Sequence, residues 1–264
     1  MLVNSVIIVL REVLEAALMV SVLLAISRPL QLRTSWLKTG LLLGLVGAVA
    51  YGLSIGQISE LFEGVGQEVV NALLQFAAFV SLVVSVFLIA RQNCEPYRSG
   101  SLLPVAMASA IVLTVSREGS EILVFVSGFV QMEGFASNVG IGSLVGAAIG
   151  YSVGVLFYYF LLSLEDRRTL RISVVLLTLI ASGVIRQATG LLIQADWITV
   201  VGPLWDTSGL LAEESLPGQL LYALIGYEAT PSKVEVLMYT ASITAMIIAI
   251  AAGLKTSPHN RMKS

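Results

Sequence analysis

Charged residues and metal-binding side chains other than carboxylates are scarce in this sequence of 264 residues. Charged residues make up 12% of the chain, whereas a soluble domain has about 25%. The single cysteine, Cys94, excludes a disulfide framework and a thiolate metal cluster. The single histidine, His259, stands in a polar tail and excludes histidine-based zinc, haem or catalytic-triad chemistry within a membrane. A net charge of −2 leaves no basic surface for nucleic acid.

Hydrophobic residues, in contrast, are abundant at 56%. Apolar runs long enough to cross a ~30 Å hydrocarbon core as a helix recur along the chain. We therefore predict an all-α polytopic membrane protein with seven transmembrane helices. The predicted spans cover residues 2–26, 35–57, 67–91, 102–130, 138–163, 170–194 and 233–254. Residues 195–232 are predicted to form an outer loop with a short interfacial or re-entrant helix, not an eighth span.

Basic residues predict the orientation, because cytoplasmic loops carry the excess of Lys and Arg. Most of these residues follow the first, third, fifth and seventh spans: Arg28, Arg33, Lys38, Arg91, Arg98, Arg167, Arg168, Arg171, Lys255, Arg261 and Lys263. The N-terminus is therefore expected outside the cytoplasmic membrane and the C-terminus in the cytoplasm. The outer loops are acidic, which is explained either by ordinary solvation or by a negative vestibule that concentrates cations. The candidates for cation recruitment are Glu60, Glu63, Glu68, Asp206 and Glu228.

An internal repeat is visible in the charged motifs. Residues 11–15 read REVLE and residues 117–121 read REGSE, an offset of 106 positions (117 minus 11). The same offset carries Gly40 to Gly146 and Gly44 to Gly150. The pattern predicts two three-helix repeats, at about 1–95 and about 102–195, with 233–254 as an additional helix. Because three is odd, the two copies cross the membrane in opposite directions, as in many secondary transporters.

Seven ionisable residues fall deep inside the predicted spans, away from their ends: Arg11, Glu12, Glu15, Arg117, Glu118, Glu121 and Arg186. Each costs ~2.5–3.5 kcal/mol at the bilayer centre unless it is paired, hydrated or bound to something. The spacing of three places each glutamate pair on one helix face. A buried ion-pair network that sets helix register is one interpretation. However, four acids against three bases leave one acid over.

We therefore favour a cage of four carboxylates for a hard cation such as Mg²⁺, Ca²⁺, Mn²⁺ or iron. Arg11 and Arg117 would limit the repulsion between the carboxylates, and Arg186 would pair with a motif glutamate or gate the path. No organic cofactor is expected. An intramembrane hydrolase is disfavoured, because the chain has no serine or cysteine nucleophile motif. A membrane scaffold or sensor without transport activity is a further alternative.

Several segments together resemble the oxidase-dependent iron transporters, the high-affinity iron permeases of fungi and bacteria, including EfeU-like bacterial members. These segments are LREVLEAAL at 10–18, REGSE at 117–121, ASGVIRQATG at 181–190, WDTSGLL at 205–211 and GYEATPSKVEV at 226–236. Two departures stand out. Val13 replaces the usual glycine of the first motif, which is expected to restrict close helix approach there. By one alignment Asn71-Ala72 stands where relatives often carry Glu-Gly, and ELFEG at 60–64 is another match that needs a shift of about nine residues.

The resemblance implies iron uptake, with Glu12, Glu15, Glu118 and Glu121 as iron ligands. It also implies oxidase or peroxidase partners and iron-binding proteins outside the membrane, and leaves Fe²⁺ and Fe³⁺ both open. A transporter of another hard divalent cation, such as manganese, is the alternative.

Overall fold

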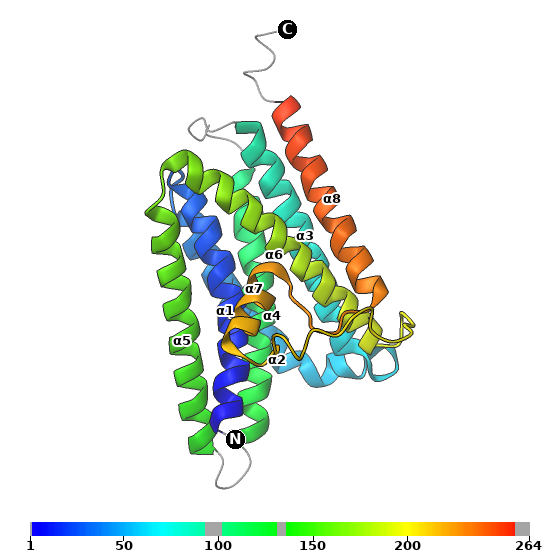
Figure 1. The fold of residues 1–264 in the computed structure, drawn as a ribbon. Coiled ribbons are helices and arrows are strands. Elements are labelled where there is room, and N and C mark those ends of the chain that lie inside the picture. Colours follow the sequence, from blue (N-terminus) through cyan, green and yellow to red (C-terminus); the bar gives the residue numbers. More distant parts are fainter. Residues whose placement is uncertain (1, 93–101, 131–135, 257–264) are drawn as a thin grey trace.

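The structure is a computed structural model that describes residues 2–92, 102–130 and 136–256 (Figure 1). These residues form a helical bundle whose long helices run roughly along one axis. The helices are α1 (Leu2–Ser27), α2 (Ser35–Ser59), α3 (Gly66–Gln92), α4 (Leu103–Val130), α5 (Ala136–Leu162), α6 (Asp166–Gln194), α7 (Leu216–Ile225) and α8 (Lys233–Lys255). A 3₁₀ turn, η1 (Leu61–Gly64), joins α2 to α3. Outside the described residues lie Cys94, Arg98, His259, Arg261 and Lys263.

Each predicted span coincides with one long helix. Five of these helices (α2, α3, α5, α6 and α8) are apolar and long enough to cross a membrane, as expected of a multi-pass membrane protein. The other two, α1 and α4, have 26 and 28 residues, about 39 Å and 42 Å at ~1.5 Å per residue. They carry the two RExxE motifs, whose charges lower their hydropathy. The predicted short helix of the outer loop is α7, whose 10 residues reach only ~15 Å.

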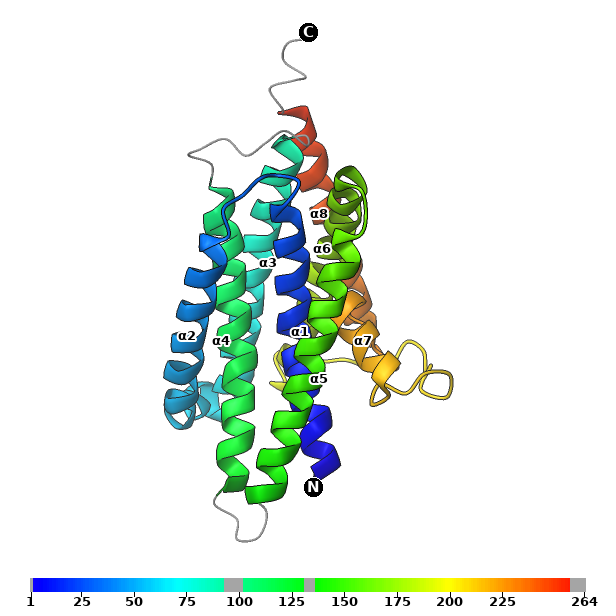
Figure 2. The ribbon, with the colours of Figure 1, turned by 90° about the vertical axis from the view of Figure 1, so that its left-hand side faces the viewer.

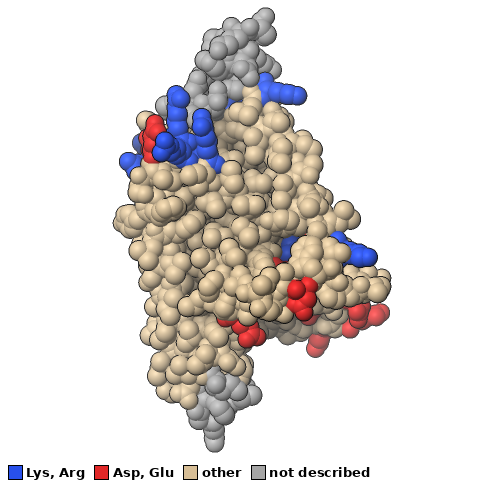
Figure 3. Space-filling model, viewed as in Figure 1, with Lys and Arg blue, Asp and Glu red and all other residues tan. Residues whose placement is uncertain are grey.

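The two ends of the bundle carry opposite charge. On the face shown in Figure 3, most Lys and Arg side chains gather at the end where α8 terminates, and Asp and Glu side chains lie toward the other end. We call these the basic end and the acidic end. Helices α1, α3 and α5 also terminate at the basic end (Figure 1). The predicted separation of basic and acidic loops is thus present in the fold, although no membrane defines its sides.

Glycines allow two pairs of helices to pack very closely. Helix α5 runs along α1, and α2 runs along α4 (Figure 2). A Cβ added to Gly44 would lie 2.7 Å from the Cβ of Val115 on α4, and one added to Gly142 would lie 2.7 Å from the carbonyl oxygen of Leu2 on α1. Contacts this short exclude any side chain at these positions. Each of the glycine-rich helices α2 and α5 therefore packs on the helix that carries the RExxE motif of the other predicted repeat.

The same packing explains how Val13 is tolerated in the first motif. A Cβ added to Gly150 would lie 3.1 Å from the Cβ of Val13, so Val13 fills the space that the glycine leaves open. In the second motif the arrangement is reversed, because Gly119 faces Ala48, with 2.8 Å between an added Cβ and the alanine Cβ. The expectation that Val13 restricts close approach is therefore wrong, since α5 presents no side chain opposite it.

Adding one methyl group to this interface is expected to destabilise the protein. In Gly146→Ala the new Cβ would contact the carbonyl oxygen of Val6 and lie 3.0 Å from the backbone nitrogen of Leu10. Backbone cannot move aside cheaply, so we expect a loss of about 1–3 kcal/mol, seen as a lower melting temperature in detergent. Gly56→Ala is the control, because nothing lies within 4 Å of an added Cβ there. Equal melting temperatures for the two variants would contradict the interpretation.

The apolar core lies in the half of the bundle toward the basic end. It combines the second halves of α1 and α3 with the first halves of α4 and α6, and its most buried members include Leu23, Ile26, Leu82, Met107 and Leu177. The half toward the acidic end contains the RExxE motifs. The fold therefore places the charged motif residues between the acidic end and a tightly packed apolar layer.

Helix α7 is held against this charged half. Ser215 caps its N-terminus by accepting a hydrogen bond from the N–H of Gly218, and Gly226 ends it with a φ of 67°, a left-handed conformation that glycine adopts readily. Gly226 packs on Gly183 of α6, where an added Cβ would lie 2.9 Å from the Gly226 Cα. This close contact brings Tyr222 of α7 beside the motif residues.

Candidate metal centre

The two RExxE motifs meet where α1 passes α4. Glu12, Glu118 and Glu121 each offer a carboxylate oxygen, and these three oxygens lie within 4.8 Å of one another. We call these residues the three-glutamate cluster. The side chains of Glu12 and Glu118 are almost completely buried, and that of Glu121 is 22% exposed. Such a group of oxygens is a suitable ligand set for a hard cation.

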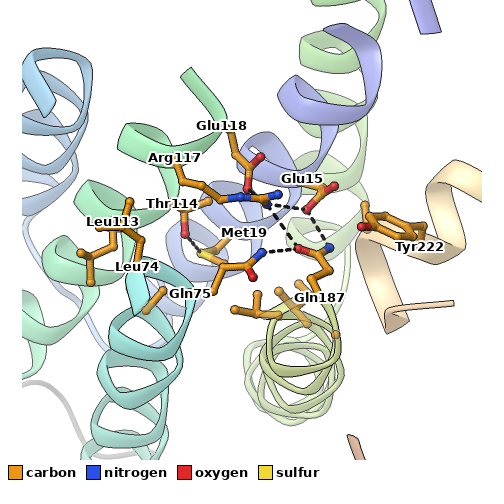
Figure 4. Close-up of a pocket in the computed structure, with 15 residues that line it drawn as sticks. Glu15, Met19, Leu74, Gln75, Leu113, Thr114, Arg117, Glu118, Gln187 and Tyr222 are labelled. Carbon is orange, nitrogen blue, oxygen red and sulfur yellow. Dashed lines mark hydrogen bonds and ion pairs between the residues drawn. The ribbon is translucent and has the colours of Figure 1, made fainter. Parts of the chain in front are cut away.

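Arg117 contacts three of the four motif carboxylates, two of which, Glu15 and Glu118, are seen beside it in Figure 4. One terminal nitrogen lies 2.7 Å from a carboxylate oxygen of Glu118 and 3.7 Å from one of Glu15, and the other lies 3.0 Å from Glu121. A planar guanidinium can contact several carboxylates at once, unlike a compact ammonium group. Arg117 therefore limits the repulsion among three of the four motif glutamates.

Glu15 is set apart from the three-glutamate cluster. Its carboxylate accepts a hydrogen bond of 2.9 Å from the amide of Gln187 on α6. The Gln187 carbonyl oxygen in turn accepts one of 2.7 Å from Gln75 on α3 and one of 3.3 Å from Arg117. Where the sequence predicted a cage of four carboxylates, the structure brings three together and places the fourth in an amide network.

Arg11 belongs to the more exposed side of the site. Its guanidinium lies 3.1 Å from Glu12 and 3.9 Å from Glu15 and stands over the ring of Tyr222, 5.2 Å from the ring centroid. The Arg11 side chain is 42% exposed, whereas that of Arg117 is 7% exposed. The two motif arginines are therefore not equivalent in the fold, despite their equivalent positions in the repeat.

Arg186 does not pair with a motif glutamate. Its guanidinium forms ion pairs with Glu228, in the loop after α7, and with Glu235 of α8, 3.4 Å away. It also stands over the ring of Tyr222, 4.9 Å from the ring centroid. The predicted pairing is wrong, because the outer loop and the start of α8 each place a carboxylate against Arg186. These two partners lie 42 and 49 residues after Arg186 in the sequence.

Burial raises the pKa of the Glu228 carboxyl to about 7. The guanidinium of Arg186 opposes this increase, and the carboxylate of Glu213 adds to it. Glu228 is thus a poorly solvated acid in the loop that covers the site, and its carboxyl group titrates near neutral pH.

A large cavity opens beside the three-glutamate cluster. Its volume is about 760 Å³, and its lining is rich in charged and amide side chains. Glu12, Glu121 and Arg117 line it from the bundle, and Glu213, Glu228 and Tyr222 line it from the outer loop and α7. A cation could therefore reach the cluster through a polar space whose lining has more acidic than basic side chains.

Only part of the predicted recruitment set faces this cavity. Glu68 and Glu228 line it, whereas Glu60, Glu63 and Asp206 do not. Glu60 is exposed just before η1, and Glu63 is exposed within it. Asp206 is fully exposed, and hydrogen bonds from Ser208 hold its pKa below the usual value. The structure thus offers no shared site for the five predicted acids.

Three amide residues at the site were not identified as site residues from the sequence. Asn71 donates a hydrogen bond of 3.2 Å to Glu121 and accepts one of 2.8 Å from Tyr51. Gln75 follows one turn later on α3, and Gln187 is the neighbour of Arg186 on α6. All three are buried polar residues in apolar spans, and the spacing of four between Asn71 and Gln75 is the signal that could have revealed them.

Comparisons with known proteins agree with this chemistry. A family model described as the iron permease FTR1 family matches residues 2–257. A protein of Yersinia pestis named ferrous iron permease EfeU is 27% identical over 283 residues, covering 95% of this chain and 98% of the relative. Proteins with the same name from Shigella sonnei and Escherichia coli O157:H7 are each 27% identical over 264 residues, covering 92% of this chain and 93% of the relative. No solved structure matches the chain.

Proposed function

The chain belongs to the iron permease FTR1 family, and from this premise we propose that it carries iron inward across the cytoplasmic membrane through the three-glutamate cluster. The observation that carries the proposal is that Glu12, Glu118 and Glu121 converge within 4.8 Å beside a polar cavity. Carboxylates in a membrane are costly unless they are neutralised. A cation that binds among them removes that cost, so binding is strongest for an ion of high charge.

The proposed topology has seven membrane crossings, two inverted repeats and an additional helix. The repeats are about 1–95 and about 102–195, followed by the outer loop 195–232 and the helix 233–254. Two observations support this division: the RExxE motifs recur at one offset, and α5 packs on α1 as α2 packs on α4. In this arrangement the acidic end and the N-terminus face outward, and the basic end and the C-terminus face the cytoplasm.

The membrane potential is sufficient to drive this transport. An inside-negative potential contributes ~2.3 kcal/mol per charge for each 100 mV, so Fe²⁺ gains about 5 kcal/mol and Fe³⁺ about 7 kcal/mol on full transfer. The relatives named ferrous iron permease favour Fe²⁺ as the transported form. The family resemblance further suggests that an oxidase or peroxidase and an iron-binding protein deliver iron at the acidic end, where Glu68, Glu213 and Glu228 border the cavity.

The proposal is tested by iron uptake into proteoliposomes that contain only this chain. With an inside-negative potential, radioactive iron is expected to accumulate at least tenfold above empty liposomes, from Fe²⁺ held reduced by ascorbate or from ferric citrate. Comparison of the two identifies the transported valence. A tenfold excess of Mn²⁺ is expected to reduce uptake less than twofold. No accumulation from either form would refute iron transport, and dominant uptake of manganese would identify the alternative substrate.

A further inference from the structure

A second, much smaller cavity lies next to the three-glutamate cluster (Figure 4). Its volume is about 20 Å³. Helices α1, α3, α4 and α6 enclose it, and Tyr222 borders both this cavity and the large one. Its wall combines polar side chains, including Arg117, Thr114 and Gln187, with apolar ones such as Leu113 and Ile180. Met19 and Ile180 belong both to this wall and to the apolar core.

Three buried oxygens at this cavity lack a hydrogen-bond donor. They are Oε1 of Glu15, Oε2 of Glu118 and Oε1 of Gln75. The side chains that carry them are at least nine-tenths buried, with exposures of 9%, 4% and 3%. Buried polar atoms in proteins are almost always paired, because an unpaired one costs about 1–3 kcal/mol. The same cavity is also lined by Arg117, whose Nε is a buried donor without an acceptor, and Oε1 of Glu15 has Arg11 at 3.9 Å as an ion-pair partner. Three acceptors without a hydrogen bond against one such donor still indicate a missing electropositive group.

We propose that this cavity is an inner binding site for a dehydrated hard cation, with Glu15, Glu118 and Gln75 as its ligands. The inference rests on the proposed function, because the ion that occupies it arrives from the three-glutamate cluster. Glu118 belongs to both sites. An ion that keeps Glu118 as a ligand can therefore exchange Glu12 and Glu121 for Glu15 and Gln75 and advance toward the basic end.

The size of the cavity determines the state of its occupant. A cavity needs roughly 10–15 Å³ to hold one water, so about 20 Å³ accommodates one water or one bare metal ion. A fully hydrated ion does not fit, because each additional water would need about as much space again as the first. The ion must therefore lose its water at this point, and protein oxygens must replace that water as ligands.

A single water explains the unpaired oxygens less well than a cation does. A water molecule donates two hydrogen bonds, whereas three acceptors require a donor. A cation interacts favourably with all three oxygens at once. The amide of Gln75 is uncharged, so it supplies an oxygen ligand without adding a third negative charge. Passage requires that binding be strong enough for the ion to arrive and weak enough for it to leave. An amide ligand in place of a third carboxylate binds the ion less tightly and therefore favours its release.

The surrounding contacts hold the inner site in place. Gln187 donates to Glu15 and accepts from Gln75, so one amide positions two of the proposed ligands. On the far wall Thr114 donates to the sulfur of Met19, 3.1 Å away. Met19 belongs to the apolar core described above. The inner site is therefore closed toward the basic end, and the ion waits there until the helices separate.

Gln75→Leu tests the inner site without altering the three-glutamate cluster. Ferrous iron under ascorbate is the probe, measured as binding to protein in nanodiscs and as flux into proteoliposomes. We expect a dissociation constant within twofold of that of the wild-type protein, because the three-glutamate cluster is intact. The maximal flux is expected to fall at least tenfold, because the ion lacks its next ligand. A flux within twofold of the wild type would overturn the proposal.

Two further variants separate a ligand from a structural residue. Gln75→Glu retains an oxygen but loses the amide that donates to Gln187, and it is expected to keep at least one third of the wild-type flux. If it is as inactive as Gln75→Leu, the hydrogen bond is what matters, and the inner site is rejected. Gln219→Leu is the matched control, because Gln219 is also 3% exposed with an unpaired carbonyl oxygen but lines neither cavity. Its flux is expected to be unchanged.

The outcomes also distinguish this inference from the proposed function. If the wild-type protein moves no iron, the function fails and the inner site fails with it. If the wild-type protein and Gln75→Leu both move iron, the function stands and only the inner site fails. Should Gln75→Leu fail to fold, anomalous diffraction from iron-soaked wild-type crystals provides the test. A peak among Glu15, Glu118 and Gln75 supports the site, and no peak there at saturating iron refutes it.

Discussion

Replacing Glu118 with glutamine is expected to abolish iron transport, with uptake falling at least 100-fold. Glu118 is 4% exposed and is the one glutamate that belongs to both the three-glutamate cluster and the proposed inner site. Glutamine preserves the size of the side chain but removes its negative charge. It also leaves the Arg117 nitrogen, 2.7 Å away, without its nearest carboxylate partner. The measurement is radioactive-iron uptake into proteoliposomes.

Glu63→Gln is the control for this substitution. Glu63 is exposed within η1 and does not line the large cavity. Its replacement is expected to change uptake less than twofold, which would also exclude it from cation recruitment. Both variants should elute from size exclusion as the wild type does, since a glutamine of equal size adds no volume to the core. Uptake by folded Glu118→Gln above one tenth of the wild-type rate would refute the assigned role of Glu118.

Lysine at Arg117 is expected to reduce iron transport at least tenfold, although the positive charge is retained. Arg117 contacts Glu118 and Glu121 through different nitrogens, at 2.7 Å and 3.0 Å, and also approaches Glu15. A lysine ammonium is a point charge and cannot reproduce this fork. At least one buried carboxylate would lose its partner, which costs several kcal/mol. Uptake and melting temperature in detergent are both expected to fall.

Arg11→Lys is the matched substitution at the equivalent position of the first motif. The Arg11 side chain is 42% exposed and contacts Glu12 at 3.1 Å, with Glu15 at the longer distance of 3.9 Å. Water can solvate a carboxylate that the lysine ammonium does not reach, so we expect uptake to fall less than threefold. Equal losses in Arg11→Lys and Arg117→Lys would show that the motif, and not its environment in the fold, determines the importance of the arginine.

The long helices were predictable because the information that determines them is local. Residues 67–91 are apolar over a length that crosses a membrane, and α3 extends over Gly66–Gln92. The one clear difference in a boundary is α6, which begins at Asp166 and not at 170. The basic residues of its first turns are too polar for the hydropathy pattern, but helices tolerate them well. The spacing within each RExxE motif likewise places both glutamates on one face, because it depends only on helix geometry.

The sequence by itself determined the helices, the opposite charge of the two ends and the presence of paired carboxylates in the apolar spans. The tertiary structure alone decided that Glu12 joins Glu118 and Glu121, that Glu15 turns toward Gln187, and that the outer loop and α8 supply the partners of Arg186. The reason is physical. Spacing along one helix specifies which residues share a face. The rotation and height of one helix against another depend on packing between distant segments, such as Gly150 on Val13 and Gly226 on Gly183.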